Sequence, residues 1–251
     1  MVTNPISLQM YTVRDDAARD PLGTLRGVAA AGYRAMELAG TFGMSASDLR
    51  AELDRLGVVV SGAHVALERL ESDLDGVIAE MQTLGGAYVI CPFLMPHRRG
   101  NLAAYQRLAG TLNSIGARCR DAGLRFAYHN HDFELQRFGD TTGLHAMLSG
   151  TDATAVAFEL DVYWATYAGF DPVALIGEFA GRAPLIHLKD MTPPPERTFA
   201  EVGHGILDIP AICAAADAAG AEWFVVEQDR CQRPALESVR LSHEYLTSIG
   251  R

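Results

Sequence analysis

The sequence has few cysteines, fewer basic than acidic residues and no long apolar run, and each shortage excludes a class of protein. Its four cysteines are scattered and form no C-x-x-C pair: Cys91, Cys119, Cys213 and Cys231. We therefore expect buried reduced thiols rather than a zinc knuckle or a disulfide framework. The formal net charge of -10 opposes binding to nucleic acid or to an anionic membrane surface.

No segment approaches the roughly 20 apolar residues that a membrane helix needs. The first residues, MVTNPISLQMYTVRDD, lack the basic start and long apolar run of a secretory signal. We therefore expect a cytoplasmic protein. Hydrophobic residues make up 49% of the 251-residue chain and charged residues 21%, which is enough apolar surface for a folded core. This length predicts one domain over residues 1–251 and is ordinary for an α/β barrel.

Short segments rich in β-branched residues alternate with longer segments in which apolar residues recur every three or four positions. The candidate strands cover residues 6–11, 33–38, 58–64, 87–92, 124–130, 155–161, 184–190 and 223–229. The candidate helices cover residues 21–32, 45–57, 72–86, 101–123, 141–150, 171–181, 208–220 and 234–250. Several helices begin with Ser, Asp, Asn or Pro and nearly all end at Gly, as helix caps do.

Strict alternation of strand and helix predicts parallel strands joined by right-handed crossovers. Eight such units predict a closed (β/α)8 barrel, the α/β fold called the TIM barrel. An open doubly wound sheet is the structural alternative, but no G-x-G-x-x-G follows the first strand to support a dinucleotide site. In the closed barrel the active site lies at the C-terminal ends of the strands.

Seven of the eight candidate strands end in polar or ionisable side chains. These are Gln9 and Tyr11, Glu37, His64, the HNHDFE run at 129–134, Glu159 and Asp161, His187 and Lys189, and Glu227 and Asp229. An unpaired buried polar group costs about 1 to 3 kcal/mol, so these side chains must satisfy one another, a metal or a ligand.

Alternation along the strands selects the inward-facing candidates. Asp161, His187 and Glu227 each occupy a position that can point into the barrel, and His129 is a fourth candidate. Imidazole and carboxylate ligands suit Mn²⁺, Mg²⁺, Co²⁺ or Zn²⁺ and not a thiolate site. A divalent metal held there would polarise a carbonyl and stabilise an enediolate, which indicates sugar chemistry.

Four further polar or aromatic residues are candidates for substrate binding. Lys189 could bind a substrate oxygen or pair with a neighbouring acid such as Asp190, which we interpret as a turn residue. Trp164 fits a wall that stacks on a sugar, or packing beneath a loop. Glu37 and His64, at the ends of the second and third strands, complete this group.

Seven motifs run in order along essentially the whole chain: SLQMYTVRD, GYRAMELAG, YHNHDFEL, FELDVYWAT, PLIHLKDM, GHGILDI and VVEQD. Together they resemble the xylose isomerase-like barrel superfamily, in particular the proteins called sugar phosphate isomerase/epimerase. The resemblance implies a metal site formed by His129, Asp161, His187 and Glu227. Many relatives read E-N-H where this chain has His129 and the two residues after it.

This departure bears on the mechanism. Related ketose epimerases use a glutamate after strand five and another after strand eight as a pair of acid/base groups. With His129 in the first position, Glu134 or His131 could act as the second acid/base group beside Glu227. Similar histidine-rich motifs occur in relatives resembling inosose dehydratase and in relatives acting on 3-keto-glycosides, which eliminate a group next to a ketone.

The leading hypothesis is a metal-dependent isomerase or epimerase acting through an enediolate on a keto or aldo sugar or a polyol. A lyase or dehydratase acting on a 3-keto sugar or inosose is the first alternative, and a non-catalytic sugar-binding barrel is the second. A nuclease of the endonuclease IV type shares the barrel but needs a basic DNA face, which the charge of -10 opposes. Helix faces such as AAYQRLAGTL could pack on the barrel or on a second copy in a homo-oligomer.

Overall fold

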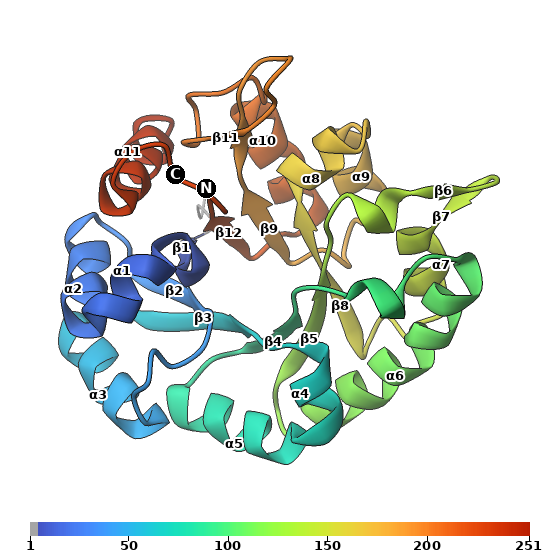
Figure 1. Cartoon of the computed structure of the whole chain (residues 1–251), viewed down its shortest axis with the longest axis horizontal. Helices are drawn as coiled ribbons and strands as arrows, with labels where there is room; N and C mark the ends of the chain where they lie inside the picture. The colour runs from blue at the N-terminus through green and yellow to red at the C-terminus, as the bar shows by residue number, and fades with distance from the viewer. Residues whose placement is uncertain (1–4) are drawn as a thin grey trace.

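A computed structural model describes residues 5–251 and contains a closed barrel of eight parallel strands surrounded by helices (Figure 1). The barrel strands are β1 (Ile6–Gln9), β2 (Ala35–Leu38), β3 (Val59–His64), β4 (Tyr88–Cys91), β5 (Arg125–His129), β8 (Val156–Asp161), β9 (Leu185–Leu188) and β12 (Trp223–Val226). They follow one another in chain order, and β12 pairs with β1 to close the barrel. The predicted (β/α)8 barrel is confirmed, and each strand lies within the range predicted for it.

Three strands, β1, β9 and β12, end two or three residues earlier than the sequence pattern predicts. Lys189 and Glu227 therefore lie just beyond the strands rather than inside them. At these points the chain leaves the barrel wall and turns toward the next helix. The prediction placed both residues correctly at the barrel mouth but extended the strands too far.

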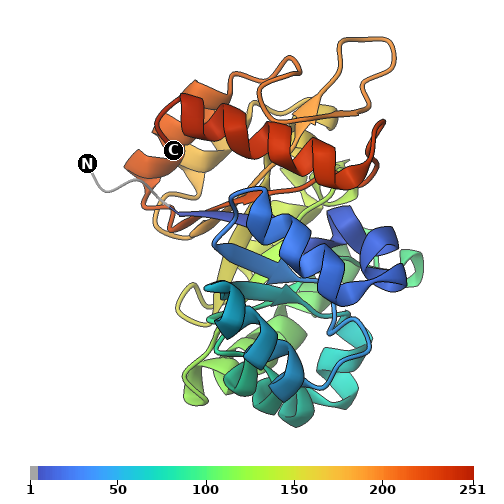
Figure 2. The same ribbon diagram turned by 90° about the vertical axis from the view of Figure 1, so that its left-hand side faces the viewer.

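Eight helices occupy the predicted helical segments: α2 (Pro21–Ala30), α3 (Ala46–Leu56), α5 (Leu74–Leu84), α6 (Leu102–Asp121), α7 (Gly143–Ser149), α9 (Pro172–Glu178), α10 (Ile209–Ala219) and α11 (Ala235–Ser248). Side-chain oxygens of Asp20, Ser45 and Asn101 accept backbone N–H groups at the starts of α2, α3 and α6. Gly57 ends α3 in the left-handed conformation, with a φ of 66°. Figure 2 shows α11 lying beside α2, so the last helix completes the ring.

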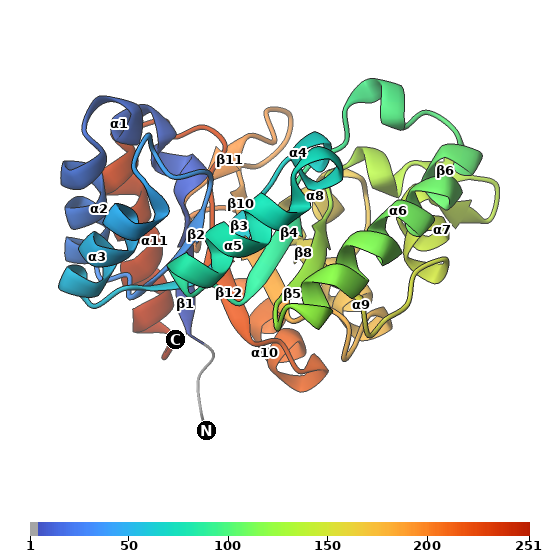
Figure 3. The ribbon, with the colours of Figure 1, turned by 90° about the horizontal axis from the view of Figure 1, so that it is seen from below.

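Shorter elements, which the sequence pattern did not predict, lie in the loops. They are the helices α1 (Arg14–Arg19), α4 (Leu67–Ser72) and α8 (Val162–Tyr167), the 3-10 turns η1 (Met10–Val13), η2 (Pro96–Arg98) and η3 (Phe133–Leu135), and the strand pairs β6 (Arg137–Phe138) with β7 (Thr141–Thr142) and β10 (Asp190–Met191) with β11 (Phe199–Ala200). Each is too short to show a period in the sequence. Figure 3 shows α4, α8 and β11 at one end of the barrel.

The barrel interior is apolar at one end and polar at the other. A small interior cluster contains Tyr88, Ile90, Ala127, Leu185 and Val225. His129, His187 and Glu227 come two positions after Ala127, Leu185 and Val225, respectively. Because side chains alternate with a period of two, these polar groups face inward at the C-terminal ends of the strands. The fold therefore gathers them at one end of the barrel.

Two minor expectations from the sequence concern cysteines and turns. Cys91, Cys119 and Cys213 are buried free thiols, and Cys231 is half-buried rather than buried. The carboxylate of Asp190 accepts three backbone N–H groups from the loop at 203–207, which confirms its structural role in the turn. No helix within residues 5–251 is long and apolar enough to cross a membrane.

Candidate metal centre at the barrel mouth

Neighbouring strands place their polar side chains in layers. Along β8, Glu159 precedes Asp161 by two residues, and His187 precedes Lys189 by two residues at the end of β9. Asp161 and His187 are partners in the register between these two strands. The period of two therefore places one layer of ionisable groups above another, from the barrel interior to its mouth.

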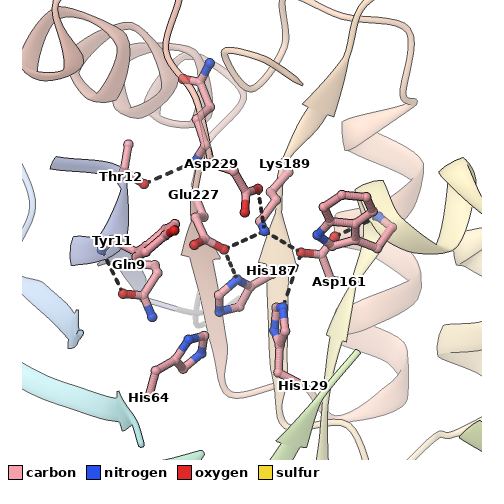
Figure 4. Close-up of polar contacts among 12 residues, drawn as sticks. Gln9, Tyr11, Thr12, His64, His129, Asp161, His187, Lys189, Glu227 and Asp229 are labelled. Carbon is pink, nitrogen blue, oxygen red and sulfur yellow. Dashed lines mark hydrogen bonds and ion pairs between the residues drawn. The ribbon is translucent and has the colours of Figure 1, made fainter. Parts of the chain in front are cut away.

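The upper layer contains the metal group that the sequence predicts. Four buried residues each offer a ligand atom, and these atoms all lie within 4.8 Å of one another: His129, Asp161, His187 and Glu227. Nδ1 of His187 lies 3.0 Å from Oε2 of Glu227, and Nε2 of His129 lies 3.7 Å from Oδ2 of Asp161 (Figure 4). The structure thus brings together all four residues from four different strand ends.

Lys189 is the only lysine of the chain, whose other basic residues are all arginine. Its side chain is 1% exposed, and its ammonium lies 2.6 Å from Glu227, 3.0 Å from Asp161 and 3.0 Å from Asp229 (Figure 4). Burial alone would lower the pKa of this ammonium, but the three carboxylates raise the pKa well above its ordinary value. Lys189 therefore stays charged and partly neutralises the acids of the mouth.

The four residues of the upper layer fit a divalent metal. Two imidazoles and two carboxylates are a borderline-hard donor set, and no thiolate is among them. Burial and the neighbouring cations keep the pKa of His129 well below its ordinary value, so this ring is neutral and keeps a lone pair for a metal. Oδ2 of Asp161 is buried and lies 3.0 Å from the Lys189 ammonium and 3.7 Å from Nε2 of His129. A divalent ion would share this oxygen with Lys189.

A deeper layer lies behind these ligands and contains Glu37, Glu159 and His64. Both glutamates are fully buried. Nε2 of His64 lies 3.0 Å from Oε1 of Glu37 and 2.8 Å from Oε2 of Glu159. Gln9 donates a hydrogen bond of 2.7 Å to the same oxygen of Glu37. This layer combines with His129 and His187 in a dense polar network inside the barrel.

A cavity of about 850 Å³ opens above the upper layer. Its polar side includes His64, Lys189 and Glu227, and its opposite side includes Phe93 and Phe133. The two phenylalanine rings meet edge to face with centroids 5.3 Å apart. The cavity therefore combines a polar floor with an aromatic wall, as sites for small polar ligands often do.

His131 and Trp164 line this cavity with their rings. His131 stacks on Phe133 with ring centroids 5.4 Å apart. Its Nδ1 atom and the Nε1 atom of Trp164 are buried and have no hydrogen-bond partner within the described part of the chain. Burial, together with the charge of Lys189, lowers the pKa of His131 to about 3, so this imidazole is neutral.

Two of the residues predicted for catalysis or substrate binding do not line the cavity. Glu134 is fully buried, accepts a hydrogen bond from the Tyr128 hydroxyl and another of 2.8 Å from the backbone N–H of His131, and belongs to neither metal group. Burial raises the pKa of its carboxyl to about 7. Glu37 lies in the deeper layer and does not line the cavity. Both carboxylates support other residues of the site instead of facing a ligand.

Sequence reasoning also missed residues that the structure places at the site. Arg99 lines the cavity, and its guanidinium stacks 3.4 Å above the ring of Phe133. Phe93 belongs to the same wall and follows β4 by two residues. Neither occupies a strand end, so alternation gave no signal for them. Glu159 did have a signal, because it lies two residues before Asp161 on the same face of β8.

Comparisons with known proteins support the TIM barrel fold. Residues 25–249 match the xylose isomerase-like TIM barrel family, and the chain belongs to this family. A sugar phosphate isomerase/epimerase from Parabacteroides distasonis has a similar structure, with a TM-score of 0.88, 24% identity, and coverage of 100% of this chain and 96% of that one. The structure of the IOLI protein with a bound zinc atom has a TM-score of 0.75 at 14% identity, and covers 98% and 97% of the two chains.

The curated relatives match this chain over only part of their length. The inosose dehydratase of Geobacillus kaustophilus is 24% identical over 185 residues, which are 64% of this chain and 58% of that protein. The inosose dehydratase of Clostridium beijerinckii is 27% identical over 153 residues, 54% of this chain and 50% of that protein. The match therefore spans 50 to 58% of the length of these relatives. Members of the family include isomerases, epimerases and dehydratases acting on sugars or related polyols.

Proposed function

We propose that the protein is a metal-dependent lyase that removes a proton next to the ketone of a keto sugar or inosose and expels the substituent on the following carbon. One observation carries this proposal. The neutral imidazole of His131 and the carboxylate of Glu227 line the same cavity. Their strands, β5 and β12, are separated by β8 and β9 in the barrel, so the two groups approach a ligand from different sides.

His129, Asp161, His187 and Glu227 would hold the divalent metal. When bound, such an ion acts as a Lewis acid toward a carbonyl oxygen and makes the neighbouring carbon acid stronger. The contacts of Glu159 with His129 and of Glu37 with His187 keep these two imidazole rings in place.

His131 acts as the base in this proposal. Because its pKa is lowered to about 3 in the metal-free protein, it is a weak base, and the transfer depends on the stronger acidity that a bound ion would give the carbon. The imidazole takes the proton from the carbon beside the ketone and returns it to the departing oxygen, so a hydroxyl substituent leaves as water. The products are then an unsaturated ketone and water, and no further reactant is needed. Lys189 remains protonated, and its ammonium holds the carboxylates of Asp161, Glu227 and Asp229 around the site.

Two further facts support a lyase. The curated relatives named above are both inosose dehydratases. In addition, His129 stands where related ketose epimerases have their first acid/base glutamate, and Glu134 does not reach the cavity to replace it. The symmetric pair of glutamates that those epimerases use is therefore incomplete in this chain.

An isomerase or epimerase is the second candidate. It is favoured by Glu227, which occupies the position of the second acid/base glutamate of related epimerases and lines the cavity. Here the ionised carboxylate of Glu227 would remove the proton from one face of the carbon, and His131, after taking up a proton from water, would return one to the other face. Glu227 would then release its proton to water. Both candidates begin with removal of the proton next to the ketone, so the products distinguish them.

The test is product analysis with the metal-loaded protein. An inosose and a 3-keto-glucoside are each incubated with the protein, and the mixture is examined by mass spectrometry and NMR. We expect loss of water or of the aglycone without formation of an epimer, and an epimer without elimination would establish the second candidate instead. His131→Gln should lose at least 100-fold in rate, the scale of general base catalysis, and still bind the metal. His145→Gln is the matched control, because His145 lies on α7 and does not line the cavity.

A further inference from the structure

The rings of His129 and His187 lie between two layers of carboxylates, and each ring has one nitrogen toward either layer. Toward the mouth, Nε2 of His129 faces Asp161 at 3.7 Å and Nδ1 of His187 lies 3.0 Å from Glu227. Toward the interior, Nδ1 of His129 lies 3.0 Å from Oε2 of Glu159. The two rings therefore connect the carboxylates of the upper layer with those of the deeper layer.

The interior nitrogen of His187 has two carboxylate neighbours. Its Nε2 atom lies 2.9 Å from Oε1 of Glu37 and 3.2 Å from Oε2 of Glu159. A carboxylate can only accept hydrogen bonds, so a neutral ring that bonds to it must carry its proton on the bonded nitrogen. Glu159 consequently favours a proton on Nδ1 of His129 and on Nε2 of His187. Glu227 faces Nδ1 of His187 in the same way, so this ring can hold protons on both nitrogens in the metal-free protein. An ion held by Glu227 would take the place of the Nδ1 proton, and Glu37 and Glu159 would keep the proton on Nε2.

We propose that Glu159, assisted by Glu37, is a positioning residue that selects opposite tautomers in the two histidines, and that the metal binds Nε2 of His129 and Nδ1 of His187. This inference rests on the metal site of the proposed function. Hydrogen bonds from ligating histidines to carboxylates orient the rings and increase their basicity. The full burial of both glutamates follows from this role, because neither has to reach the substrate.

The alternative position for the ion uses the other nitrogens. A second group of possible ligands combines His64, Glu159 and the same two histidines, with its atoms also within 4.8 Å of one another. An ion there would bind Nδ1 of His129 and Nε2 of His187, with Glu159 as a direct ligand. The two positions therefore predict opposite nitrogens for each ring, and one measurement separates them.

The experiment is NMR of the zinc-loaded protein labelled with 15N-histidine, with signals assigned from single histidine variants. Zinc is diamagnetic, and the 15N shifts distinguish a metal-bound nitrogen from a protonated one. We expect zinc on Nε2 of His129 and on Nδ1 of His187. Zinc on the two interior nitrogens overturns the inference but leaves a metal-dependent function intact. Failure of any divalent ion to bind overturns the proposed function and the inference together.

Metal affinity gives the second readout. Glu159→Gln keeps the shape of the side chain but removes its charge, and should weaken zinc and Co²⁺ binding by about 10- to 100-fold in calorimetric titrations. Glu222→Gln is the matched control at the far end of the barrel, where Glu222 pairs with Arg125 and the Tyr88 hydroxyl, and its metal affinity should equal that of the wild type. Unchanged affinity and an unchanged Co²⁺ absorption spectrum in Glu159→Gln contradict the inference.

Discussion

Replacing Lys189 with methionine tests the electrostatics of the barrel mouth. Lys189 is 1% exposed, and its ammonium contacts Asp161, Glu227 and Asp229 at 2.6 to 3.0 Å. Methionine has a similar length and no charge. In the metal-free protein the substitution leaves Asp161 and Glu227 buried without their cation, whereas a bound divalent ion would supply the missing charge.

The expected cost follows from the burial of these groups. Removing one partner of a buried ion pair destabilises a protein by about 3 to 5 kcal/mol, because the remaining charge keeps its desolvation penalty. We therefore expect Lys189→Met to lower the free energy of unfolding by that amount in the presence of a chelator. Added Co²⁺ or Zn²⁺ should stabilise the variant more than the wild type and recover part of the loss.

Urea unfolding followed by circular dichroism, with and without metal, measures both quantities. Arg125→Met is the control, because Arg125 and its partner Glu222 are about half exposed and such a pair contributes at most about 1 kcal/mol. If Lys189→Met costs no more than this control, or if metal stabilises the variant and the wild type equally, the reasoning about the mouth is wrong.

Three further predictions concern Glu134, Gly116 and Trp164. Burial raises the pKa of the Glu134 carboxyl from 4.5 to about 7, whereas the unfolded chain releases this proton near pH 4.5. The contribution of Glu134 to stability is therefore lost as the pH rises from about 4.5 to about 7. Glu134→Gln should therefore reduce the fall in unfolding free energy between pH 4.5 and pH 8 by roughly 3 kcal/mol, measured with urea. Gly116→Ala should destabilise by about 1 to 3 kcal/mol in the same assay, because the added Cβ would lie 2.3 Å from the carbonyl oxygen of Ala155. Trp164→Phe replaces the indole that lines the cavity with a smaller ring and should raise KM by up to about tenfold, the scale of one aromatic contact, with kcat changed less.

Each of these three predictions has a contrary outcome. Parallel pH profiles for the wild type and Glu134→Gln would mean that this carboxyl titrates near its ordinary value. An unchanged unfolding free energy in Gly116→Ala would mean that α6 can move away from Ala155 without cost. A Trp164→Phe protein with an unchanged KM would place the substrate away from this wall.

The periodicity of the sequence was sufficient to predict the barrel and the upper layer of the site. His187 and Glu227 lie two positions after apolar strand residues, and Asp161 lies four positions after one. In a closed barrel this even spacing puts all three on the inside at one end. The same rule applies to Glu159, two residues before Asp161. Its supporting role required the side-chain contacts, because the sequence does not show which carboxylates face the imidazoles from below.

The loops explain the remaining differences. Glu134 is close in sequence to His131, but the 3-10 turn η3 directs its carboxylate to the Tyr128 hydroxyl and away from the cavity. Arg99 reaches the site from the irregular segment after β4. Such positions depend on loop conformation, which neither residue type nor spacing determines.

Exchange of the proton next to a ketone tests the central claim most directly. A keto sugar or inosose is incubated in deuterated water with the metal-loaded protein, and the loss of that proton is followed by NMR, whatever the final product. We predict metal-dependent exchange that a chelator stops and that Asp161→Asn, which removes a charge from the proposed ligand group, reduces by at least 100-fold, roughly the loss from removing one electrostatic contact in an active site. Exchange at the same rate after complete removal of metal, or no exchange by the loaded protein with any keto sugar or inosose, would contradict a metal-dependent proton abstraction at this site.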